Sequence, residues 1–121
     1  MKILLVDDLP EIRQMLETRL QLEGYEVLTA ENGQKGLDCM KENHIDLILT
    51  DFQMPVMTGP EMISALRQAQ VSIPIILMSG DFSNKDDAQA RARIFQADAG
   101  YDKTSGFANL VKIIKDLQPA S

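Results

Sequence analysis

Short runs of branched apolar residues recur along this chain and alternate with segments of helical spacing. Five runs are visible, at residues 3–6, 25–29, 46–50, 73–78 and, more weakly, 99–101. The first, third and fourth consist mostly of Ile, Leu and Val with little polar alternation. Such runs are typical of strands that are buried on both faces of a parallel sheet. We therefore expect five strands, with the central ones fully buried.

Apolar residues at helical spacing predict a helix after each run. The expected starts are Pro10, Gln34, Thr58, about Asn84, and a cap at Thr104 or Ser105. Thr58 and Glu61 have the spacing of a capping box, in which each side chain accepts from the other residue's backbone N–H. Gly24 is suited to end the first helix. The chain thus alternates strand and helix five times.

The fourth predicted helix, residues 84–96, differs from the others in its inward side chains. These are mainly Ala88, Ala92 and Phe95. Alanine buries little area, so we expect this helix to be lightly anchored and able to move.

Alternating strands and helices predict an α/β fold, a doubly wound three-layer sandwich with a five-stranded parallel sheet. Right-handed crossovers leave only a few strand orders open. The 121 residues fit one domain, 1–121, with residues 117–121 as a tail or the start of a linker.

The composition excludes several classes of protein. The net charge of -6 argues against direct nucleic-acid binding, which favours a basic surface. The single cysteine, Cys39, permits no internal disulfide and suits the cytoplasm. The longest later apolar run contains Pro74 and is too short to cross a membrane, so we expect no membrane span.

Polar or charged side chains that could bind a ligand or react follow four of the predicted strands. Asp7 and Asp8 follow the first strand, Asp51 the third, Ser79 the fourth and Lys103 the fifth. In open α/β sheets, ligands bind beyond the carboxyl ends of the strands. We therefore expect three carboxylates, a hydroxyl and an ammonium to converge on one edge of the sheet.

Three close carboxylates repel one another and favour a cation between them. A cluster of oxygen ligands suits Mg²⁺, which completes its coordination with waters and phosphate oxygens. Aspartate is a known nucleophile in phosphoryl transfer, and a lysine can pair with a phosphate oxygen. The sequence therefore predicts a Mg²⁺-assisted phosphoryl site.

These residues resemble the CheY-like receiver domain of two-component response regulators over nearly the whole chain. The matching motifs are the strand ending in Asp7-Asp8, the segment DFQMPVMTG at 51–59, the segment IILMS at 75–79, and Asp102-Lys103. Each motif alone is weak, but their order and spacing together are specific. The resemblance implies the flavodoxin-like strand order 2-1-3-4-5.

The resemblance also implies a metal site. Asp8 and Asp51 would bind Mg²⁺ (or Mn²⁺) directly, and Asp7 would bind it through a water molecule. The backbone carbonyl of Gln53 would supply a further protein ligand.

The remaining roles implied by the resemblance concern the phosphoryl group. Asp51 would accept it from a sensor histidine kinase or a phosphotransfer protein, and Ser79 and Lys103 would engage it. Gln53 and Asp81 would tune its loss, because such a domain promotes only its own phosphorylation and autodephosphorylation and is no enzyme otherwise. Phosphorylation would then change the surface of the last two helices and the fifth strand, to control a downstream effector or output domain. The chain would be a monomer or a phosphorylation-dependent dimer.

Two positions depart from the family pattern. Thr104 stands where the family usually has a proline after the lysine, so we expect a trans peptide bond before it. Gly100 stands where an aromatic residue is usual. Because neighbouring strand residues point to opposite faces, Tyr101 cannot simply replace that aromatic. We favour absence of the aromatic switch over a local shift of the strand.

Two other functions fit the same fold. A phosphatase of the haloacid dehalogenase type would use an aspartate after the first strand and a second one two residues later, where this chain has Asp7 and Leu9. A flavodoxin-like cofactor binder would need a phosphate-cradling loop after the first strand, but Asp7-Asp8-Leu9-Pro10 would repel phosphate unless a metal intervened.

Overall fold

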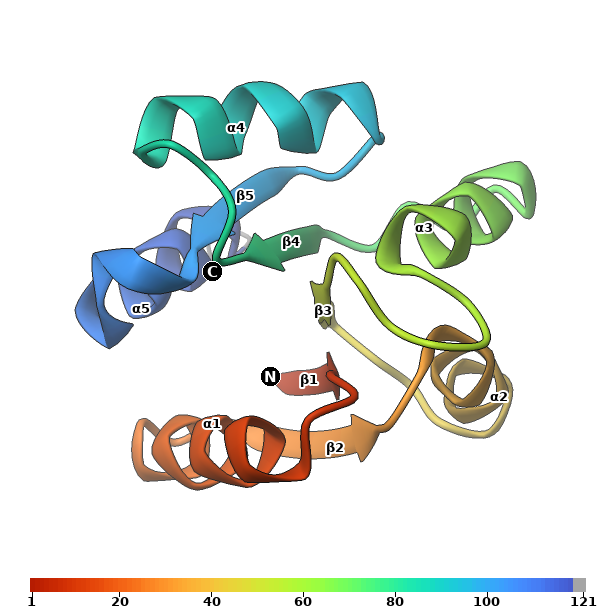
Figure 1. Ribbon diagram of the computed structural model, residues 1–121. Coiled ribbons are helices and arrows are strands. Elements are labelled where there is room, and N and C mark those ends of the chain that lie inside the picture. The colour runs from red at the N-terminus through yellow and green to blue at the C-terminus, as the bar shows by residue number, and fades with distance from the viewer. Residues whose placement is uncertain (119–121) are drawn as a thin grey trace.

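The strands and helices of the chain alternate as predicted. The structure, a computed structural model, describes residues 1–118 (Figure 1). In chain order the elements are β1 (Lys2–Val6), α1 (Pro10–Leu22), β2 (Glu26–Ala30), α2 (Gly33–Glu42), β3 (Leu47–Asp51), α3 (Gly59–Gln68), β4 (Ile75–Ser79), α4 (Lys85–Ile94), β5 (Ala99–Asp102), the 3-10 helix η1 (Lys103–Ser105) and α5 (Phe107–Leu117).

The strands form one parallel sheet in the order β2-β1-β3-β4-β5, which confirms the predicted fold. Helices α1 and α5 cover one face, while α2, α3 and α4 lie on the other side (Figure 1). Asp51 pairs with Met78, and Ser79 pairs with Asp102. The carboxyl ends of β3, β4 and β5 therefore lie side by side.

Two apolar clusters, one on each face of the sheet, hold the layers together. Alternate residues of β1 supply them: Ile3 and Leu5 face α1 and α5, whereas Leu4 and Val6 face the opposite helices. All four are fully buried. Full burial of such a side chain contributes roughly 1.5–3 kcal/mol. The unbroken apolar runs of the sequence thus reflect a sheet that is covered on both faces.

Local signals fix most helix ends. The Thr58–Glu61 capping box is present, with Glu61 N donating to Thr58 Oγ1 at 3.2 Å and Thr58 N donating to Glu61 Oε1 at 3.0 Å. Gly24 follows α1 with φ +95°, a conformation that glycine adopts without strain. The predicted cap of α5 was wrong, since Gly106 occupies the N-cap position without a side-chain hydrogen bond. Thr104 and Ser105 belong to η1 instead.

The chain end is described up to Gln118. Leu117 is the last residue of α5 and packs against the core, so the helix includes the first residue of the predicted tail. Residues 119–121 lie outside the described part of the chain. Within residues 1–118, no helix has the length and apolar character needed to cross a membrane.

Helix α4 lies directly on β5 because Gly100 has no side chain. A Cβ on Gly100 would lie 2.0 Å from the carbonyl oxygen of Ala88. Ala88 and Ala92 are fully buried, which confirms the prediction that α4 faces the core with small side chains. The side chain of Gln89 adds a polar anchor by hydrogen bonding to the Gly100 backbone, which the sequence pattern did not reveal.

Candidate functional site

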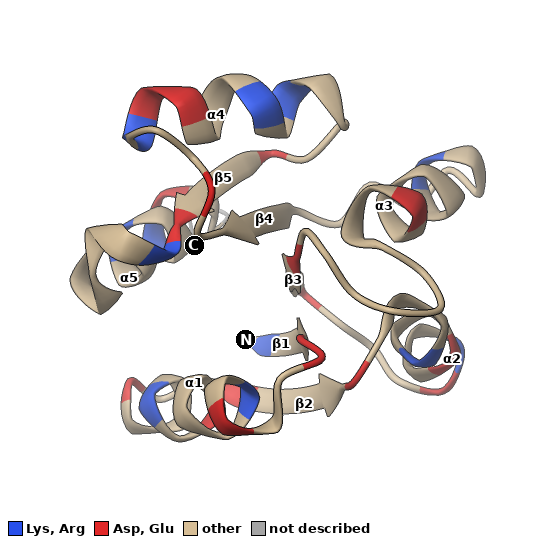
Figure 2. Ribbon diagram, viewed as in Figure 1, with Lys and Arg blue, Asp and Glu red and all other residues tan. Residues whose placement is uncertain are grey.

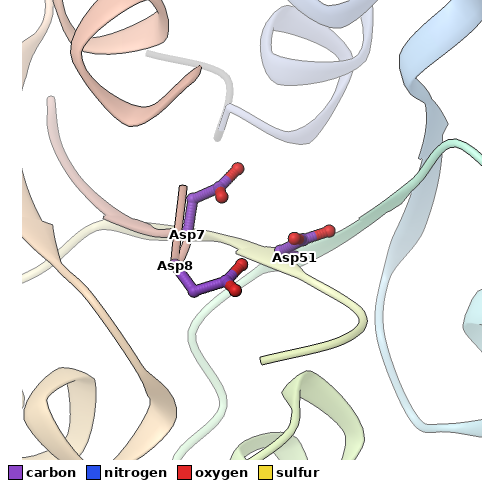
Figure 3. Close-up of side chains that lie close together, drawn as sticks. All are labelled: Asp7, Asp8 and Asp51. Carbon is purple, nitrogen blue, oxygen red and sulfur yellow. The ribbon is translucent and has the colours of Figure 1, made fainter. Parts of the chain in front are cut away.

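Three acidic side chains meet at the carboxyl edge of the sheet. Figure 2 shows acidic residues in the loop after β1 and at the end of β3. Asp7 and Asp8 follow β1, and Asp51 ends β3 (Figure 3). Each offers a carboxylate oxygen, and these oxygens all lie within 4.8 Å of one another. The predicted convergence of Asp7, Asp8 and Asp51 is therefore present.

Asp7 is the most deeply buried of the three, with no exposed surface. Its Oδ1 accepts a hydrogen bond from Leu9 N at 3.0 Å, which shapes the turn into α1. Its Oδ2 is buried without a hydrogen-bond partner, and the Lys103 Nζ lies 3.5 Å away. The Arg13 guanidinium donates to the Asp7 backbone carbonyl at 2.7 Å. One carboxylate oxygen of Asp7 is thus left for a further ligand.

Asp51 is only 8% exposed, and its environment opposes ionisation. Burial raises the pKa of the Asp51 carboxyl above its ordinary value, and the negative charge of Asp7 adds to the rise. The Lys103 ammonium lowers the pKa of Asp51 and offsets part of this rise. The backbone N–H of Phe52, which donates to Asp51 Oδ1 at 2.9 Å, also lowers the pKa. Additional positive charge would therefore favour the ionised, nucleophilic form.

Lys103 is the cation that the fold supplies to this cluster. Its Nζ lies 3.0 Å from Asp51 Oδ1 and 3.5 Å from Asp7 Oδ2. The position immediately after β5 carries the side chain back across the sheet edge toward β3 and β1. The convergence of Lys103 with the carboxylates, expected from the strand ends, is present.

Ser79 lies at the end of a neighbouring strand, and Gln53 lies in the loop after β3. Ser79 ends β4 and is buried, and its Oγ accepts from Asp81 N at 3.0 Å. The hydroxyl proton therefore stays available for another acceptor. Gln53 is exposed two residues after Asp51, and Asp81 is exposed two residues after Ser79. Their predicted roles, including the Gln53 carbonyl as a metal ligand, stay predictions.

The donor set fits a hard divalent cation. All three side chains offer carboxylate oxygens, which Mg²⁺ prefers, and one of these oxygens is buried without a hydrogen bond. Lys103 contributes one positive charge against three carboxylates, so the cluster keeps an excess of negative charge. A divalent cation would balance that charge.

The loop from β3 to α3 holds a strained residue that the sequence did not reveal. Val56 has φ +69°, which is a rare conformation for a β-branched residue. Met57 N donates to Pro55 O at 2.7 Å and so closes a three-residue turn with Val56 at its centre. The Val56 side chain is 80% exposed. The start of α3, directly after this loop, packs closely on the end of β3, because a Cβ on Gly59 would lie 2.2 Å from the Asp51 carbonyl oxygen.

Comparison with known proteins assigns the chain to a family. The family model for the response regulator receiver domain matches residues 3–115. The chain therefore belongs to the response regulator receiver domain family, whose members act in phosphorylation-dependent two-component signalling. It is a regulatory domain rather than an enzyme of the usual kind, and the phosphatase alternative is not favoured.

Curated relatives include longer transcriptional regulators. The transcriptional regulatory protein GlrR of Escherichia coli is 35% identical over 88 residues, which cover 73% of this chain and 20% of GlrR. The cell cycle transcriptional regulator CtrA of Caulobacter vibrioides is 38% identical over 80 residues, which cover 66% of this chain and 35% of CtrA. The matched region thus spans about a fifth to a third of these relatives.

Solved structures of similar length share the fold. The chemotaxis protein CheY4 of Vibrio cholerae has a TM-score of 0.84 and 33% identity, and the match covers 97% of this chain and 98% of CheY4. The response regulator TrrA of Thermotoga maritima, in complex with Mg(2+)-BeF, has a TM-score of 0.82 and 35% identity, with the same coverage. TrrA in complex with the histidine kinase ThkA has a TM-score of 0.83 and 34% identity, and the match covers 98% of both chains.

Proposed function

We propose that Asp51 accepts the phosphoryl group and that Asp7, Asp8, Ser79 and Lys103 assist. The observation that carries this proposal is the Lys103 ammonium 3.0 Å from a buried carboxylate, beside two further carboxylates. Phosphoryl transfer depends mainly on positioning and on charge compensation, and this arrangement supplies both.

The phosphoryl group moves from a nitrogen atom to an oxygen atom. An Asp51 carboxylate oxygen attacks the phosphorus atom, a new P–O bond forms, and the P–N bond of a phosphohistidine breaks. The donor imidazole nitrogen keeps the bonding electron pair. The product on Asp51 is a mixed anhydride, an aspartyl phosphate. Water later attacks it and releases inorganic phosphate, which is the autodephosphorylation expected of this site.

Each neighbouring side chain has a separate task. The Lys103 ammonium contacts a phosphoryl oxygen in place of the Asp51 carboxylate, because it is a compact positive charge. The Ser79 hydroxyl donates to another phosphoryl oxygen. Asp8, Asp51 and the Gln53 carbonyl would hold Mg²⁺ (or Mn²⁺) directly, and Asp7 through water. Bound there, the ion would neutralise charge on the carboxylates and on the phosphoryl oxygens.

The readout runs through Ser79 and α4 rather than through an aromatic side chain. Gly100 faces α4, while Tyr101 faces the other side of the sheet and its hydroxyl donates to Gly106 O at 3.0 Å. The strand keeps a regular register at both residues. Movement of Ser79 toward the phosphoryl group would shift the loop that leads into α4.

The partners of this site follow from the same chemistry. The donor would be a sensor histidine kinase or a phosphotransfer protein, and the TrrA–ThkA complex supports that class of partner. The target would be a downstream effector or an output domain, since longer relatives are transcriptional regulators. Residues 1–121 would act as one receiver domain in the cytoplasm, as a monomer or as a phosphorylation-dependent dimer.

Intact-mass spectrometry tests the proposal directly. Incubation with acetyl phosphate and Mg²⁺ should add one phosphoryl group to the wild type and none to Asp51→Asn. Asp38→Asn, which changes an exposed carboxylate on α2, is the matched control and should be labelled like the wild type. Equal labelling of wild type and Asp51→Asn would exclude Asp51 as the acceptor.

A further inference from the structure

The turn after β5 is built around the carboxylate of Asp102. This residue ends β5 and is only 5% exposed. Its Oδ1 accepts two hydrogen bonds, both from Thr104: one from the backbone N at 2.9 Å and one from Oγ1 at 2.7 Å. Such a side-chain cap sets the backbone direction of the residue enclosed between donor and acceptor. The enclosed residue is Lys103.

A second set of contacts ties the same turn to α5. Ser105 Oγ donates to the Asp102 carbonyl at 2.6 Å and accepts from Asn109 Nδ2 at 2.9 Å. The backbone on both sides of Lys103 is therefore fixed by side-chain hydrogen bonds. These bonds account for the hydroxyls of Thr104 and Ser105, which lie inside η1, and Asp102 is the N-cap residue of that turn.

We propose that Asp102 and Thr104 are positioning residues that direct the Lys103 ammonium onto Asp51, an inference that rests on the proposed function. The Nζ reaches Asp51 Oδ1 at 3.0 Å from the first residue of η1, directly after the end of β5. The paired hydrogen bonds from Thr104 to Asp102 fix the backbone at this residue. Neither residue touches the phosphoryl group, and both act through Lys103.

The chemistry of Thr104 explains why this residue suits the position. A proline here would have neither an N–H nor a hydroxyl, so neither bond to Asp102 could form. The Thr104 hydroxyl and then its N–H hold the pKa of Asp102 below its ordinary value, because both hydrogen bonds stabilise the charged carboxylate. Because Thr104 is exposed, removing its hydroxyl sacrifices almost no packing.

A double-mutant cycle with acetyl phosphate tests the inference. Thr104→Val keeps the shape and the N–H but lacks the hydroxyl, and it should slow phosphorylation of Asp51 about two- to tenfold, the range of one hydrogen bond. Thr104→Ser should restore the rate. In a Lys103→Ala background, Thr104→Val should have no further effect, because the group that it positions is gone.

The results for Thr104 and for Lys103 can be told apart from a failure of the proposed function. A wild-type rate for Thr104→Val, or an equal slowing with and without Lys103, would overturn the positioning role. A wild-type rate for Lys103→Ala would overturn the role of Lys103 and the positioning role with it. Failure of the wild type to label at Asp51 would instead overturn the proposed function. Unfolding free energies of all variants, measured in urea, confirm that the rates compare folded proteins.

Discussion

The side-chain amide of Gln89 in α4 pairs with the backbone of Gly100 in β5. Gln89 Nε2 donates to the Gly100 carbonyl at 3.0 Å, and Gly100 N donates to Gln89 Oε1 at 3.3 Å. The two bonds join the helix to the strand at the position where the family pattern has an aromatic residue. Close approach is possible because Gly100 lacks a side chain.

Gly100→Ala should lower the free energy of unfolding by about 1–3 kcal/mol, the usual cost of overpacking a close contact. The added Cβ would meet the Ala88 carbonyl oxygen at 2.0 Å, so α4 must move away from β5. Gly80→Ala is the matched control, because nothing lies within 4 Å of a Cβ there. Urea denaturation of both variants provides the comparison, and equal losses would contradict the close contact.

Val56→Asn should raise the free energy of unfolding by about 1 kcal/mol, because asparagine adopts positive φ more readily than a β-branched residue. The substitution relieves the strain at φ +69°. Little burial is lost, since the valine side chain is 80% exposed. Val56→Thr keeps the β-branch and should show no gain. The idea fails if the threonine variant is stabilised as much as the asparagine variant in urea denaturation.

Asp51→Asn should stabilise the protein at neutral pH in the absence of Mg²⁺. The folded-state pKa of Asp51 is raised by burial, so the unfolded chain ionises first as pH rises. The free energy of unfolding of the wild type therefore falls as pH rises from the ordinary pKa to the raised pKa, and it stays lower above that window. The advantage of Asp51→Asn should grow across the same window and vanish below it. Urea denaturation at a series of pH values measures the difference; a constant difference would contradict the raised pKa.

Mg²⁺ should stabilise the folded protein by about 2.7 kcal/mol at a free concentration of about one hundred times its dissociation constant. Asp8→Ala should weaken Mg²⁺ binding more than Asp7→Ala, because Asp8 is assigned a direct contact and Asp7 a contact through water. Calorimetric titration gives the affinities, with Asp38→Ala as an exposed control on α2. The opposite order of the two affinities would exchange the assigned roles of Asp7 and Asp8.

The sheet could be predicted well from the sequence because burial on both faces leaves a strong local signal. Unbroken runs of Ile, Leu and Val are typical of buried strands, and parallel strands bring their carboxyl ends to one edge. Asp7, Asp8, Asp51 and Lys103 could therefore be brought together from the sequence alone. The strand ends were less well defined, as at Ser79, because pairing continues past the apolar run.

Features that depend on which of several hydrogen-bond partners a side chain takes, or on how closely two elements pack, could not be predicted in the same way. The expected α5 cap was wrong because Thr104 and Ser105 form a separate 3-10 turn that is hydrogen-bonded to Asp102, and α5 begins only at Phe107, after Gly106. An Asp with a Thr two residues later is a recognised turn pattern and could have indicated this. The Gln89–Gly100 pairing and the positive φ of Val56 leave no periodic signal, because both depend on how separate elements meet.

Strand β5 lies at the edge of the sheet and pairs only with β4 among the described strands. An open edge of this kind offers unpaired N–H and C=O groups to another chain. At Gly100 both groups are already bonded to the Gln89 amide, which imitates a neighbouring peptide. The same contact that joins α4 to β5 therefore also removes the hydrogen-bonding groups of Gly100 from those that this edge offers to an added strand.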